Sequence, residues 1–175
     1  MNDYKYVDLI LGKQCQTKMG RGGIRPLEFK TFSKEMQNAI TNYCQAGGNF
    51  FVSGAYVASD LWDNRLVKAN EEDKKFAMEV LKYKWRVGQA ARNGKVKSVA
   101  SPFPEITGSY TYYQDLNPES YVVESPDALE PAAQGAFTIL RYSENNLSAG
   151  IAYKGNYKTC VLGFPFEAIR TSLYT

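Results

Sequence analysis

The order of apolar segments in the first third of the sequence constrains the fold more than any other feature. Residues 6–11 form a short apolar run that is typical of a buried strand. Residues 33–46 place apolar side chains at helical spacing, with Ser33 as the expected N-cap and Gly47 after the end. A second apolar run covers residues 49–54. Strand, helix and strand in this order predict a parallel crossover unit and therefore an α/β fold.

The rest of the chain changes from helical to strand-like patterns. Helices are expected at 59–64 and at 71–87, the second capped by Asn70 and closed by basic residues. Pro and Gly separate the strands expected after Gly94, and asparagines mark the C-terminal turns, which favour antiparallel hairpins. The expected strands are 95–100, 109–113, 120–123, 137–142, 147–153 and 157–163, with a closing helix at 166–172. One mixed-sheet α/β domain over residues 1–175 accounts for all of these segments.

The absence of histidine excludes histidine-dependent catalysis by this chain alone. A serine or cysteine nucleophile normally needs a nearby base, and the sequence contains no histidine among its 175 residues. The 21 basic residues are scattered among 18 acidic ones, a pattern that predicts a solvated surface and no nucleic-acid partner. No apolar run is long enough for a membrane span, and the first residues lack the features of an export signal.

The cysteines and the glycine-rich loop predict neither a metal nor a cofactor. The three cysteines have no Cys-x-x-Cys spacing; Cys44 and Cys160 are expected to be buried, and Cys15 is the only plausible reactive thiol. Residues 19–25 contain three glycines and two arginines but lack the Gly-Lys-Ser/Thr ending of a phosphate-binding loop. A basic connecting loop is the favoured interpretation.

Two turns carry the candidate site residues. Ser53, Tyr56 and Asp60 follow the second predicted strand, at the position where α/β enzymes display a nucleophile and bind ligands. Arg141, Glu144 and Asn145 gather polar groups at one predicted hairpin turn, where they could bind a partner or satisfy the turn backbone. Without a base for Ser53, structural roles in the turn are favoured.

Two further groups of residues have weaker functional interpretations. Four tyrosines could form an aromatic platform for sugar rings, although cross-strand tyrosine pairs also stabilise ordinary sheets, and that interpretation is favoured. They are Tyr110, Tyr112, Tyr113 and Tyr121. A glycosidase needs two carboxyl groups facing one cleft, and no sequence argument brings two together. The carboxylates near predicted strand ends are Asp8, Asp60, Asp63, Glu144 and Glu167.

Four segments carry a resemblance to a known family. They are residues 7–12, 47–55, 149–153 and 161–167. These segments resemble a domain of secreted gut-bacterial proteins that carry the label xanthan lyase, and the domain is similar to the class I glutamine amidotransferase-like group. The resemblance implies a three-layer, flavodoxin-like fold and an extracellular or periplasmic location. It also implies a cysteine nucleophile near Ala55, where this chain has none, and Glu167 in the region of the catalytic partners.

Two functions follow from these observations as hypotheses. The first is a non-catalytic accessory or interaction domain of a larger polysaccharide-related protein, whose partners would be other domains of that protein or a polysaccharide. The second is a glycan-active lyase or hydrolase that uses tyrosine, arginine and carboxylate groups. Its candidate residues are Tyr56, Arg141, Asn145 and Asn146.

Overall fold

The computed structural model describes residues 3–15, 17–19, 27–62, 69–116, 118 and 120–170, with the backbone alone described at 17–19 and 27–29. Its centre is a mixed eight-stranded sheet with the strand order β1-β4-β11-β10-β9-β6-β7-β12. Two small two-stranded sheets, β2–β3 and β5–β8, complete the strands. The mixed α/β class predicted from the sequence is confirmed.

The strands and helices have the following bounds. The first half contains β1 (Tyr6–Ile10), β2 (Thr17–Met19), β3 (Leu27–Phe29), α1 (Lys34–Gln45), β4 (Asn49–Ser53), α2 (Ser59–Trp62), α3 (Glu71–Phe76), the π-helix η1 (Ala77–Leu81) and β5 (Tyr83–Val87). The second half contains β6 (Lys95–Ser98), β7 (Ser109–Tyr112), β8 (Ala128–Pro131), β9 (Ala136–Tyr142), β10 (Ser148–Lys154), β11 (Lys158–Leu162), the 3-10 turn η2 (Phe166–Ala168) and β12 (Ile169–Arg170).

The predicted crossover unit is present. Strands β1 and β4 pair in parallel, and α1 connects them with Ser33 as its N-cap, whose hydroxyl accepts a hydrogen bond from Met36 N. β11 then pairs in parallel with the other side of β4. The antiparallel C-terminal hairpins are also confirmed, because β10 pairs antiparallel with both β9 and β11.

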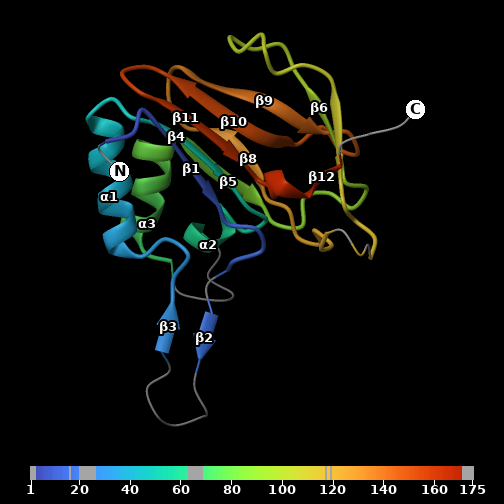
Figure 1. Ribbon diagram of the computed structural model, residues 1–175, viewed down its shortest axis with the longest axis horizontal. Coiled ribbons are helices and arrows are strands. Elements are labelled where there is room, and N and C mark those ends of the chain that lie inside the picture. Colours follow the sequence, from blue (N-terminus) through green and yellow to red (C-terminus); the bar gives the residue numbers. More distant parts are fainter. Residues whose placement is uncertain are drawn as a thin grey trace.

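The helices of the described chain pack on one face of the sheet, as Figure 1 shows for α1 and α3. Ile40 of α1 and Leu81 at the end of η1 share one buried cluster with Phe50, Val52 and residues of β11. Leu61 of α2 and Phe76 of α3 belong to the same buried cluster. The helices before and after β4 therefore lie on the same side of the sheet.

The second core lies inside a curl of the sheet. A flat sheet would separate β11 from β12 by five strand spacings, about 24 Å, yet the short link between them includes a 3-10 turn that cannot extend that far. The sheet therefore curls until β12 reaches β7. Tyr112 and Phe164 stack inside this curl, with ring centroids 5.0 Å apart.

Five of the sequence-based expectations are wrong. Strand β1, expected to be buried on both faces, is the edge strand of the sheet and has an alternately exposed pattern. The helix expected through residue 87 ends at Leu81, because Lys82 adopts a left-handed conformation (φ 69°) and residues 83–87 form β5. Residues 121–123 form no strand, and the segment after Pro126, expected as a loop, contains β8. The predicted closing helix is a 3-10 turn followed by β12, with residues 171–172 outside the described chain.

Candidate functional site

The turn after β4 is closed by its own contacts. Ser53 is fully buried, and its hydroxyl accepts a hydrogen bond from the backbone N–H of Phe166 at 3.2 Å. Ala55, at the position where the resembled family carries its nucleophile, is buried and donates its N–H to the Gly12 carbonyl at 2.9 Å. A nucleophile must reach substrate, so this turn displays none.

The other two candidates in this turn also hold the fold together. Tyr56 is half-buried; desolvation raises the pKa of its phenol, while a hydrogen bond with Ser125 opposes that rise. Asp60 opens α2, and its Oδ2 accepts the backbone N–H of Thr31 at 3.2 Å. This carboxylate therefore joins α2 to the segment that precedes α1. Asp63 lies outside the described residues.

Arg141, Glu144 and Asn145 do lie together, at the turn between β9 and β10, as the sequence predicted. The Arg141 guanidinium donates to the Asn146 carbonyl at 2.6 Å, which fixes the turn where Asn146 has a positive φ of 63°. The Asn145 amide donates to the Ala90 carbonyl at 2.6 Å. These contacts satisfy backbone groups of the hairpin and of a neighbouring loop.

Glu144 completes this arrangement. Its Oε2 accepts backbone N–H groups from Arg92 at 2.7 Å and from Asn93 at 3.2 Å. All three polar side chains of the turn therefore hydrogen-bond to backbone groups of the hairpin and of a neighbouring loop, as the structural interpretation of this cluster expects.

The four tyrosines of the predicted platform do not form one surface. Tyr112 is buried in the stack with Phe164, and Tyr110 donates its hydroxyl to the nearby Thr107 carbonyl at 2.6 Å. Tyr121 donates to Glu167 beside Gly12, at the carboxyl end of β1, and this contact raises its pKa further above the value set by desolvation. Tyr112, Tyr110 and Tyr121 thus each contact a different residue.

Asp127 is the polar residue that the sequence patterns missed. It is fully buried, and its Oδ2 accepts hydrogen bonds from Ala58 N and Ser59 N at 2.8 Å and from the Ser59 hydroxyl at 3.1 Å. Its Oδ1 accepts the indole N–H of Trp85 at 3.2 Å. Burial raises the pKa of this carboxyl to about 7 against the opposing effect of those donors. The signal in the sequence was weak: a single Asp between Pro126 and an apolar run.

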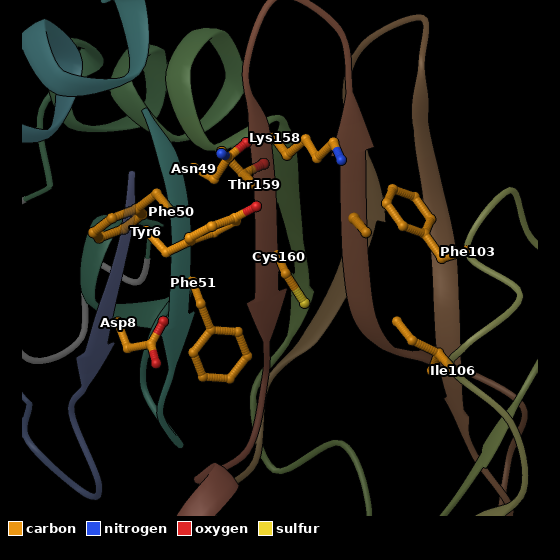
Figure 2. Close-up of a pocket in the computed structure, with 11 residues that line it drawn as sticks. Tyr6, Asp8, Asn49, Phe50, Phe51, Phe103, Ile106, Lys158, Thr159 and Cys160 are labelled. Carbon is orange, nitrogen blue, oxygen red and sulfur yellow. The ribbon is translucent and has the colours of Figure 1, made fainter. Parts of the chain in front are cut away.

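An apolar groove lies on the face of the sheet away from the helices (Figure 2). Its floor is formed by Phe51, Cys160 and Ala152 of three adjacent strands, and its far wall by Phe103 and Ile106 from the connection between β6 and β7. The groove has a volume of about 190 Å³. Tyr6, Asp8, Asn49 and Lys158 stand at its border, and the lining itself is almost entirely apolar.

None of the six predicted site residues lines this groove. The cysteine in its floor is not activated, since burial raises the pKa of Cys160 to about 12, and burial likewise raises that of Cys44 on α1 to about 11. A low pKa is what makes a thiol reactive, so both behave as small apolar side chains. Cys15 is half-buried and has contacts of its own.

The described residues contain neither a metal-binding cluster nor a membrane-spanning helix. Within that part of the chain, no group of three or more Cys, Asp or Glu side chains is arranged to hold a metal ion. Among its helices, none combines the length and apolar character that crossing a membrane requires.

Comparisons with known proteins give no relative: no family model and no curated protein matches this chain.

Proposed function

We propose that this chain is a non-catalytic accessory or interaction domain of a larger, polysaccharide-related extracellular protein. One observation supports a non-catalytic role: Ser53, Glu144 and Asn145, which the sequence places best for chemistry, all make structural hydrogen bonds to backbone groups. The apolar groove, in contrast, lies open on the face of the sheet away from the helices. The polysaccharide context and the extracellular location come from the resemblance to the domain in proteins that carry the label xanthan lyase.

The chemistry of the groove favours a polypeptide over a sugar as the partner. Sites for polar ligands combine aromatic rings with converging hydrogen-bond groups, whereas apolar side chains of another domain need only a matching surface. Here Phe51, Phe103 and Ile106 supply that surface, and polar groups stand only at its border. We therefore propose that another domain packs against this face.

The same face bears on the proposed relation to the class I glutamine amidotransferase-like group. A flavodoxin-like fold has helices on both faces of a parallel sheet. The parallel core β1-β4-β11 with α1 supports that relation, and the described helices cover one face only. A partner domain on the open face would supply the third layer.

The groove is tested with a fluorescent probe for apolar surface and with calorimetric titration of xanthan. We expect the probe to bind and the polysaccharide to give no heat, because the groove offers apolar atoms and few hydrogen-bond groups. Phe103→Lys should abolish most probe binding. Leu116→Lys is the matched control, since Leu116 is 96% exposed and lies outside the groove.

Two results would overturn the proposal. Saturable heat with xanthan that Phe103→Lys removes would identify a sugar site in the groove. Equal probe binding by the Phe103→Lys and Leu116→Lys variants would show that the groove attracts no apolar group.

A further inference from the structure

The outer edge of β1 is a regular and unpaired strand edge. β1 stands at the end of the strand order, and no described strand pairs with its outer side. Its inner side pairs with β4 over five consecutive residues without a bulge. The N–H of Asn49 bonds to the Lys5 carbonyl, and the N–H of Leu11 to the Ser53 carbonyl. Backbone groups alternate in direction along a strand, so those of Tyr6, Asp8 and Ile10 point outward.

Large apolar side chains are concentrated along this edge. Tyr6 is 64% exposed and Ile10 is 53% exposed, and Tyr4, just before the strand, is 68% exposed. Side chains two residues apart share one face of a strand, so Tyr6, Asp8 and Ile10 lie along one face of β1, and Tyr6 and Asp8 border the groove there. Exposed apolar groups next to free backbone donors and acceptors favour addition of another strand.

The opposite edge of the sheet is protected in the usual ways. β12 has only two residues, and the second is Arg170, whose guanidinium lies over the ring of Tyr113 at 4.8 Å from its centroid. Short edge strands and charged side chains discourage pairing with another chain. β1 is longer, contains no proline and carries one charge, Asp8.

We propose that β1 pairs antiparallel with β1 of a second copy of this chain, forming a symmetric dimer with a continuous sheet. A two-fold axis at Val7 places Tyr6 of each copy opposite Asp8 of the other. Each Tyr6–Asp8 pair then exchanges both backbone hydrogen bonds.

The charge of Asp8 selects this register. Neither Asp8 nor Tyr6 makes a side-chain hydrogen bond or ion pair within the described chain, so both are available to a partner. Shifting the axis to Asp8 would bring two carboxylates face to face, and like charges opposite each other destabilise a strand pair. The axis at Val7 instead offers each carboxylate a phenol hydroxyl.

Sedimentation velocity over a concentration series tests the dimer. A strand pair buries less surface than a standard interface, so we expect a dissociation constant of about 1 to 100 µM. Tyr6→Asp should raise that constant about 2- to 30-fold, because it places two like-charged pairs across the strands. The double variant Tyr6→Asp/Asp8→Lys should restore wild-type association by pairing opposite charges. Leu116→Asp is the control for the added charge.

Three outcomes would overturn the proposal. These are a monomer at all concentrations, a dimer that Tyr6→Asp leaves unchanged, and a weakened dimer that the double variant fails to restore. Circular dichroism on each variant separates lost association from lost folding. This inference is independent of the proposed accessory function, which the groove experiment tests.

Discussion

Asp127 is the residue on which the packing around the β4–α2 turn depends. Its carboxylate receives hydrogen bonds from Ala58, Ser59 and Trp85, and Gly163 lies so close that a Cβ there would meet the Asp127 carbonyl at 2.0 Å. The Tyr142 hydroxyl donates to the same carbonyl at 2.7 Å. The Asp127 side chain thus joins the turn after β4 to β5, and its backbone joins both to the link after β11.

The raised pKa of Asp127 makes stability depend on pH. The folded state holds the proton of this carboxyl up to about pH 7, whereas the unfolded chain releases it near the ordinary aspartate pKa of 3.8. Between those values the folded state binds more protons, so the free energy of unfolding contributed by this group is full below pH 3.8 and falls as pH rises toward 7. Across that pH window, we expect the free energy of unfolding of the wild type to fall by a few kcal/mol, about 4 at most, relative to that of the Asp127→Asn variant.

Urea unfolding at about pH 4.5 and about pH 7.5 measures this difference. The Asn variant cannot titrate, so its stability profile isolates the contribution of Asp127. Parallel profiles for the two proteins would show that Asp127 is ionised throughout and that its four donors outweigh its burial.

At the scale of elements, α3 is stabilised mainly through its N-terminus. Asn70 caps Asp73 N at 2.8 Å, and the Asp73 carboxylate accepts from Asn70 N and from the Gln37 amide of α1 at 2.7 Å. The helix is only six residues long before it becomes the π-helix η1. Short helices rely on caps and tertiary contacts more than on propensity.

We therefore expect Asn70→Ala to lower the free energy of unfolding by about 1 to 2 kcal/mol. Asn38→Ala is the matched control: it removes the same exposed side chain from inside α1, where alanine is favourable, and should leave stability unchanged or slightly higher. Thermal denaturation compares the two variants. An equal loss from both would contradict a specific role for the Asn70 cap.

The elements that could be predicted from the sequence are those set by neighbouring residues. The Ser33 cap, the periodicity of α1 and the Asn70 cap act over three or four residues, and the C-terminal turns act over two, so local patterns are sufficient. The helix predicted for residues 83–87 was wrong because Lys84 and Arg86 suit a helix C-terminus. The strand conformation of this segment comes instead from pairing with β8, more than forty residues away. No local pattern contains that pairing.

The candidate site shows the same limit. The turns that carry Ser53 and Arg141 were located correctly, but the burial of Ser53 depends on Phe166, and the role of Glu144 depends on Arg92 and Asn93. Asp127 acquires its partners only when distant segments close around it. Whether a polar residue is free for chemistry is thus decided by tertiary contacts.

At the scale of the whole molecule, strand order explains what is covered and what is open. The parallel strands β1, β4 and β11 stand side by side, and residues of α1, α2, α3 and η1 share one buried cluster on one of their faces. The antiparallel strands curl to enclose a second core (Figure 1). The groove remains between the parallel strands and the β6–β7 connection (Figure 2). An open apolar face beside an edge strand that no described strand pairs with is the surface through which the proposed interaction domain would contact its partners.

The most direct measurement of this account is turnover of xanthan and related acidic polysaccharides by the intact chain, followed by mass spectrometry of the products. The account predicts no cleavage above a buffer control at any pH, because Ser53, Asp60, Arg141 and Glu144 are held in structural contacts. Cleavage products that disappear in a Tyr56→Phe or Arg141→Lys variant would contradict it and establish the chain as a glycan-active enzyme.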